Sequence, residues 1–98
     1  MKIVINEDAL QWFANEMGVQ PGQHVRFYVR YGGSSPVQQG FSLGVTIEEP
    51  IDIGSQTQYN GATYFIEDRD LWYFDGHDLI VNYNSTLDEP EYNYVKPD

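Results

Sequence analysis

The chain has 98 residues, no cysteine, and a formal net charge of −10 from 15 acidic and 5 basic side chains. This charge argues against nucleic acid as a partner, because binding it requires Lys and Arg to neutralise phosphates, and it disfavours an anionic membrane surface for the same reason. The lack of cysteine excludes disulfides, thiolate nucleophiles and clusters ligated by cysteine. The length predicts a single domain over residues 1–98, whose small core leaves a homodimer open as an alternative to a monomer.

The N-terminal segment and the overall hydropathy indicate where in the cell the protein is expected. Residues Met1–Asn6 form a short apolar run that meets Glu7 and Asp8, which is not the pattern of a signal peptide. No apolar stretch approaches the length of a membrane span. We therefore expect a cytoplasmic protein.

An amphipathic helix is predicted directly after an opening strand over residues 1–5. Asn6 is a good N-cap, and the acidic residues that follow it suit the positive end of a helix dipole. Leu10, Phe13, Ala14 and Met17 recur at helical spacing and predict one buried stripe, and Gly18 ends the helix. Trp12 lies off this stripe, which leaves two interpretations open: a second contact surface, or a partly covered surface side chain.

Two alternating segments predict half-buried strands over residues 25–31 and 41–47. In the first, the side chains expected to face the core are Val25, Phe27, Val29 and Tyr31. Residues 32–40 between the two strands are rich in turn-forming residues and predict a long, flexible hairpin connection.

The second half of the chain also predicts mainly strands. Residues 51–59 are expected to be extended, and Asn60-Gly61 is a strong two-residue turn signal into a strand over residues 62–66. A short helix over residues 67–74 is followed by strands over residues 79–83 and 92–95, the last at a sheet edge. The fold class predicted is α+β and strand-rich: a small sandwich or partial barrel of mostly antiparallel and mixed strands, with an N-terminal helix and a second short helix.

Several motifs, in this order and spacing, resemble the HesB-like, A-type iron–sulfur carriers. They are Ile5-Asn6-Glu7-Asp8-Ala9, Val29-Arg30-Tyr31-Gly32-Gly33, Phe41-Ser42-Leu43-Gly44-Val45 and Leu71-Trp72-Tyr73-Phe74-Asp75-Gly76. The resemblance implies a HesB-like domain, and it implies that Gly32, Gly33 and Ser34 occupy the place of a Gly-Gly-Cys loop. The carriers ligate iron through cysteines there and in a C-terminal Cys-Gly-Cys. A serine hydroxyl replaces thiolate poorly on such iron, so the implied site is degenerate and no cofactor is expected.

One turn contains residue types that ligate metals. Asp75, His77 and Asp78 place an imidazole and two carboxylates close together in sequence. Carboxylate oxygens suit hard cations, and imidazole suits zinc or iron. Asp and Gly are also ordinary turn residues, so a structural turn stays open beside a metal site.

A surface for a protein partner is the other candidate. Arg26, Tyr28 and Arg30 are expected on the strand face opposite the apolar one, and Trp12 is a further aromatic side chain of the kind that anchors interfaces. This face suits an acidic partner or is a solvated sheet face. Ser34 and Ser35 have no histidine near them in sequence to act as a base, so we expect no enzyme.

Together these features predict a noncatalytic protein-interaction module in an iron–sulfur or metal-handling context. The alternative is a metal binder that uses Asp75, His77 and Asp78.

Overall fold

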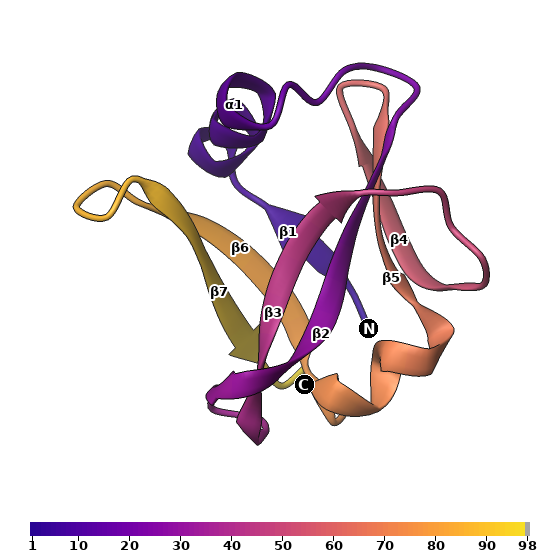
Figure 1. Ribbon diagram of the computed structural model, residues 1–98, viewed down its shortest axis with the longest axis vertical. Coiled ribbons are helices and arrows are strands. Elements are labelled where there is room, and N and C mark those ends of the chain that lie inside the picture. The colour runs from indigo at the N-terminus through magenta and orange to yellow at the C-terminus, as the bar shows by residue number, and fades with distance from the viewer. Residues whose placement is uncertain (98) are drawn as a thin grey trace.

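The computed structural model describes residues 1–97, so Asp98, the last residue of the expected domain, lies outside the described residues. The helices are α1 (Glu7–Glu16) and the 3₁₀ helix η1 (Asp68–Phe74). The strands are β1 (Ile3–Ile5), β2 (His24–Ser34), β3 (Gln39–Ile47), β4 (Ile53–Tyr59), β5 (Ala62–Glu67), β6 (Asp78–Asn84) and β7 (Glu89–Val95) (Figure 1).

The strands form two mixed sheets, which confirms the predicted strand-rich α+β class. One sheet has the order β1-β6-β7 and the other the order β3-β2-β5-β4. Each contains one parallel pair, in which Ile3 faces Leu79 and Val25 faces Tyr64. Within residues 1–97 neither sheet closes into a barrel, so β3 and β7 are each left at an edge.

Helix α1 begins and ends as predicted. The Asn6 side chain accepts a hydrogen bond of 2.8 Å from the backbone N–H of Ala9, which satisfies a donor that the first turn leaves free. Phe13 is fully buried, whereas Ala14, which was expected on the same stripe, is exposed. The buried residues of α1 are Ala9, Leu10 and Phe13, and Met17 is partly buried against the core, so the prediction for Ala14 was wrong.

Two turns follow their sequence signals closely. Tyr59 pairs with Ala62 across Asn60 and Gly61, whose φ angles of 52° and 81° are those of a tight hairpin turn. The expected long loop of residues 32–40 is mostly strand, which is a correction. β2 continues to Ser34 through a bulge after Tyr31, Ser34 pairs with Gln39, and only residues 35–38 connect the strands. The positive φ angles of Gly32 and Gly33 permit this bulge.

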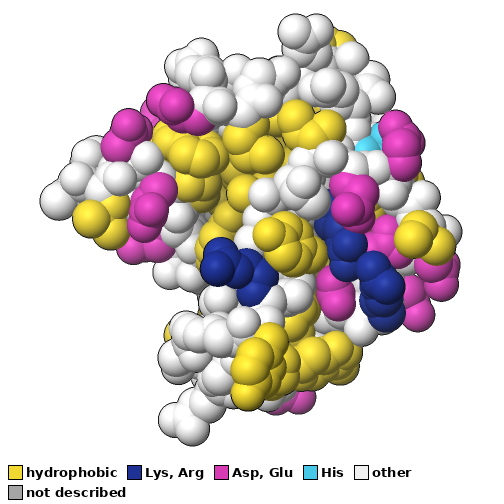
Figure 2. All heavy atoms as spheres, viewed as in Figure 1, with side chains coloured by type: hydrophobic (Ala, Val, Ile, Leu, Met, Phe, Trp, Pro, Cys, Tyr) yellow, Lys and Arg dark blue, Asp and Glu magenta, His cyan; other side chains and the backbone are white. Residues whose placement is uncertain are grey.

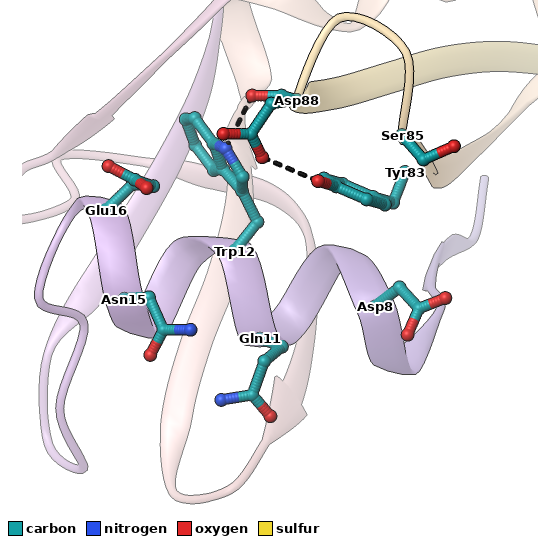
Figure 3. A pocket seen from close by; sticks show the side chains of 8 residues that line it. All are labelled: Asp8, Gln11, Trp12, Asn15, Glu16, Tyr83, Ser85 and Asp88. Atoms are coloured by element: carbon teal, nitrogen blue, oxygen red, sulfur yellow. Dashed lines mark hydrogen bonds between the residues drawn. The ribbon is translucent and has the colours of Figure 1, made fainter.

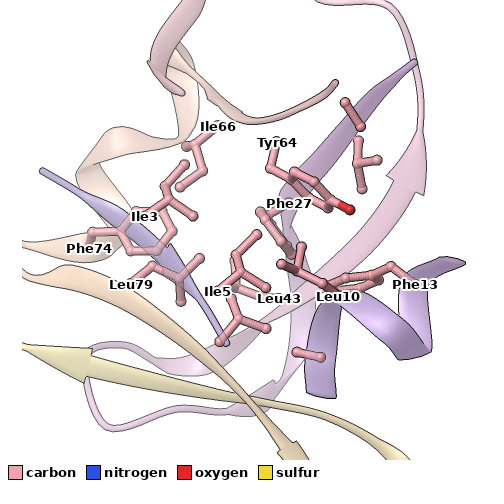
Figure 4. Packing of buried hydrophobic residues seen from close by; sticks show 14 of the residues in the cluster. Ile3, Ile5, Leu10, Phe13, Phe27, Leu43, Tyr64, Ile66, Phe74 and Leu79 are labelled. Atoms are coloured by element: carbon pink, nitrogen blue, oxygen red, sulfur yellow. The ribbon is translucent and has the colours of Figure 1, made fainter. Parts of the chain in front are cut away.

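The hydrophobic core lies between the two sheets and under α1 (Figure 4). Strand β5 is buried along its whole length and supplies Tyr64 and Ile66. Phe27 of β2 meets Tyr92 of β7 edge to face, with ring centroids 5.9 Å apart, and so joins one sheet to the other. Burying a large apolar side chain stabilises a fold by about 1.5–3 kcal/mol, so these contacts hold the sheets together.

A buried carboxylate anchors the segment before β4. Glu67 is 2% exposed and accepts hydrogen bonds from the backbone N–H groups of Ile51, at 2.8 Å, and Asp52, at 2.9 Å. Burial raises the pKa of Glu67, but the two hydrogen bonds and the charges of Arg26 and Arg69 outweigh burial and leave the pKa below its usual value. The carboxylate is therefore ionised when it holds this segment.

Candidate protein-binding groove

A groove of about 540 Å³ lies between β3 and β7, which are edge strands of the two sheets within residues 1–97. Its lining comes from α1, β2, β3 and β7 and consists of Trp12, Tyr28, Arg30, Ser42, Leu43, Gly44, Val45, Glu89, Pro90 and Tyr92. Figure 2 shows this face of the molecule, where hydrophobic side chains gather in a hollow and a basic side chain lies beside them. Aromatic walls with a few polar groups are typical of sites that bind other proteins.

The floor of the groove depends on a residue without a side chain. Tyr28 and Gly44 face each other on β2 and β3. A Cβ atom on Gly44 would lie 2.5 Å from Cζ of Tyr28 and 2.8 Å from Cδ of Arg30. Because Gly44 has no Cβ, both side chains lie across β3 and reach the groove.

The two arginines of β2 differ in what they contact. Arg26 is nearly buried: its guanidinium pairs with Glu48 at 2.8 Å and with Asp70 at 3.0 Å. It also lies 5.8 Å from the centre of the Tyr28 ring. Arg30 is exposed, and it forms no ion pair with any residue in the described range 1–97. Arg30 is therefore available to a carboxylate from outside the chain.

The structure brings together three of the four residues predicted to bind a partner. Trp12, Tyr28 and Arg30 line the groove, whereas Arg26 lines a separate hollow with Tyr28, Thr46 and Glu48. Sequence alternation places Arg26 on the same strand face as Arg30, but it does not show that Asp70, far along the chain, pairs with Arg26. The role of all four in binding stays a prediction.

Trp12 separates the groove from a second hollow of about 340 Å³ beside α1. Figure 3 shows Trp12 pointing from α1 toward the turn between β6 and β7, where its Nε1–H donates a hydrogen bond of 2.9 Å to the backbone oxygen of Asp88. The Asp88 carboxylate accepts a hydrogen bond from the hydroxyl of Tyr83. These contacts fix the indole where it lines the groove, and both interpretations of Trp12, a contact surface and a partly covered surface side chain, fit this position.

Tyr92 forms the opposite wall. Its ring packs on Phe27, so it belongs both to the core and to the groove. Burial, with a smaller effect of the nearby Glu89 charge, raises the pKa of Tyr92 well above its usual value. Its hydroxyl is therefore a neutral hydrogen-bonding group at neutral pH.

The three predicted metal ligands make separate contacts. Nδ1 of His77 lies 2.9 Å from the backbone oxygen of Phe74, and since a carbonyl only accepts, Nδ1 carries the proton and donates. Oδ1 of Asp78 accepts a hydrogen bond of 2.7 Å from the backbone N–H of Lys2, and Asp75 is an exposed turn residue at φ 48°. Among residues 1–97, no group of three or more His, Asp or Glu side chains is placed to hold a metal.

An aromatic row, which sequence alternation missed, lies beyond the end of the groove. Tyr31 was expected in the core, but its side chain is 92% exposed, which is a correction. It meets Phe41 edge to face, and Phe41 meets Trp72 in the same way, with centroids 5.7 Å and 5.3 Å apart. The end of the β2–β3 hairpin extends past the core, so no core remains for Tyr31 to face.

No helix in the described part of the chain is long and apolar enough to cross a membrane.

The chain resembles several bacterial proteins along nearly all of its length. A Bacillus subtilis protein named pyruvate dehydrogenase inhibitor is 52% identical over 94 residues, which cover 96% of this chain and 99% of that protein. An uncharacterised Staphylococcus aureus protein is 40% identical over 96 residues, which cover 95% of this chain and 98% of that protein. An uncharacterised protein from Staphylococcus saprophyticus is 37% identical over 95 residues, which cover 94% of this chain and 97% of that protein. No family model matches the chain.

These findings overturn the expected HesB-like identity and with it the iron–sulfur carrier fold and context. No family model matches, and a relative that is 52% identical is named as an inhibitor. Gly32, Gly33 and Ser34, which suggested a degenerate cluster loop, form the bulged end of β2, so backbone geometry explains the two glycines. The chain belongs to the family of small bacterial proteins that includes the Bacillus subtilis pyruvate dehydrogenase inhibitor.

Proposed function

We propose that this protein is a noncatalytic inhibitor that binds pyruvate dehydrogenase as its protein partner. The observation that carries the proposal is the 52% identity, over nearly the full length of both chains, with the protein named pyruvate dehydrogenase inhibitor. An inhibitor acts by binding, which agrees with the noncatalytic role expected from the sequence. The charge of −10 further favours a protein partner over nucleic acid or an anionic membrane.

The groove is the part of the surface best suited to this binding. Trp12, Tyr28 and Tyr92 give it large, rigid aromatic walls, and such side chains dominate the energetics of many interfaces. Arg30 forms no ion pair within the described residues 1–97, and arginine is another residue type enriched at the centre of interfaces. We therefore place the contact with pyruvate dehydrogenase on this groove.

An activity measurement tests the function. Purified Bacillus subtilis pyruvate dehydrogenase, from the organism of the named relative, is titrated with this protein, and the rate of pyruvate turnover is followed. We expect the rate to fall to a plateau at saturation, and calorimetry on the same samples to show saturable binding. A rate that stays constant at every concentration, with no heat of binding, would contradict the proposal.

Two variants test the placement on the groove. Tyr28→Ala and Trp12→Ala are expected to weaken inhibition by about tenfold or more, because truncating an aromatic anchor costs about 2 kcal/mol or more. Ile51→Ala is the matched control, since Ile51 is 83% exposed and lies outside the groove. If all three variants inhibit equally well, the contact lies elsewhere.

A further inference from the structure

We propose that pyruvate dehydrogenase enters the groove as an extended segment that adds to the edge of β3 as a further strand and places one carboxylate on Arg30. This inference rests on the proposed function and deepens it, because it specifies the conformation and charge of the contacting segment.

The groove follows the edge of β3. Four consecutive β3 residues line it, Ser42 to Val45. Successive residues of a strand point to opposite faces, so a hollow over one face would be lined by alternate residues, as it is on β2 by Tyr28 and Arg30. A hollow lined by consecutive residues runs along the strand edge. Within residues 1–97 the only strand that pairs with β3 is β2, so the backbone groups on its other side have no sheet partner.

Strand β7, on the other side of the groove, is less suited to pair with an added strand. Glu89 and Pro90 of β7 line the groove, and proline has no backbone N–H to offer to an added strand. Proline and charge on an edge strand are the features that protect sheet edges from pairing. β3 has neither between Gln39 and Ile47. An incoming segment therefore pairs with β3 and packs its side chains against β7.

The charge of the segment follows from Arg30. Arg30 is the only base among the lining residues, and it has no ion-pair partner within residues 1–97. Guanidinium and carboxylate pair through two parallel hydrogen bonds, which favours an acidic side chain at this point of the segment. Four strand residues span about 13 Å, so the added strand needs about four residues in extended form.

Hydrogen exchange tests the strand addition. The free protein and its complex with Bacillus subtilis pyruvate dehydrogenase are compared by mass spectrometry. We expect amides of β3, Gln39–Ile47, to exchange more slowly in the complex, while those of β4, Ile53–Tyr59, are unchanged. β4 is the opposite edge of the same sheet and so is an internal control. A bound complex in which β3 exchanges as fast as in the free protein overturns the inference.

Charge variants test the carboxylate. Arg30→Glu is expected to weaken binding by about a hundredfold and Arg30→Gln by about tenfold, because each removes a hydrogen-bonded charge pair. Arg30→Lys, which keeps the charge without the paired geometry, is expected to fall between Arg30→Gln and the unmodified protein. Arg69→Gln, the matched control, removes an exposed arginine outside the groove and is expected to bind normally.

The outcomes separate the two proposals. If the unmodified protein neither binds nor inhibits pyruvate dehydrogenase, both proposals fail. If it binds but Arg30→Glu binds equally well, or β4 is protected in place of β3, the proposed function stands and only the strand addition is overturned.

Discussion

The ring of Tyr28 lies over Gly44, the residue that faces it on the neighbouring strand, in space that a Cβ atom on Gly44 would occupy. This relationship builds the groove floor from two strands. It also allows the floor to be changed without removing any of its polar groups.

The first prediction concerns Gly44→Ala. The new methyl group must displace the end of the Tyr28 ring and the aliphatic part of the Arg30 side chain. Both side chains are flexible, so we expect the fold to persist with a stability change within about 2 kcal/mol. Inhibition of pyruvate dehydrogenase should weaken by about tenfold, because the displaced side chains no longer line the groove as before. Circular dichroism and urea unfolding check the fold. Thr46→Ala, on the same strand but outside the groove, is the control and should inhibit normally.

The second prediction compares the two acids that pair with Arg26. Asp70 has a side chain that is 13% exposed and also accepts a hydrogen bond from Val29 N–H, whereas the Glu48 side chain is 45% exposed. Asp70→Asn should lower the free energy of unfolding by about 1–3 kcal/mol, since it weakens hydrogen bonds to a charged group. Glu48→Gln should change it by less than about 1 kcal/mol. Equal losses in urea unfolding at neutral pH would contradict this ranking.

The third prediction is a pH dependence from Glu67. Its pKa in the folded protein is below its unfolded value, so the ionised carboxylate stabilises the fold at pH values above the unfolded pKa, about 4.3. This stabilisation is lost as the pH falls through the folded pKa. Glu67→Gln should therefore be less stable than the unmodified protein by about 1–3 kcal/mol at pH 7, and the difference should shrink below about pH 4.

Urea unfolding of both proteins across this pH range measures the difference directly. Because every other acid is common to the two proteins, their effects cancel to first order. A difference that is constant from pH 7 to pH 3 would show that the Glu67 charge is not the cause.

The fourth prediction concerns Trp12→Phe. Phenylalanine keeps much of the aromatic packing but cannot donate to the backbone oxygen of Asp88, so the free energy of unfolding should fall by about 1 kcal/mol. Trp72→Phe is the comparison, because Trp72 is 51% exposed and its indole makes no hydrogen bond among the described residues 1–97. Trp72→Phe should change the free energy of unfolding by no more than about 0.5 kcal/mol. Larger destabilisation by Trp72→Phe would reverse the assigned roles of the two indoles.

Sequence reasoning succeeded where neighbouring residues decide the structure. The Asn6 cap, the end of α1 near Gly18 and the Asn60-Gly61 turn depend on backbone conformation and hydrogen bonds within a few residues, and all three were predicted. It failed for Tyr31 and for the loop after it. Alternation shows that side chains change sides along a strand, but it does not show where the core ends.

The same distinction, between features set by neighbouring residues and features set by distant contacts, applies to the candidate groove. The residue types and the strand face of Tyr28 and Arg30 followed from the sequence, because period-two alternation is a local property. The pairing of Arg26 with Asp70 and the approach of β7 to β3 did not, since both depend on contacts between distant parts of the chain. The motif resemblance to iron–sulfur carriers failed because strands and glycine turns recur in unrelated proteins.

By itself, the sequence determined the α+β class, the element types and a charge that favours protein partners, because these follow from local backbone preferences and from composition. Only the tertiary structure decided that, within residues 1–97, β3 and β7 are edge strands of two mixed sheets and that Arg30 and Tyr28 line the groove beside them. The physical reason is that β1 pairs with β6, and β2 with β5, across long stretches of chain. Burial of the common core selects those pairings, and no short segment encodes them.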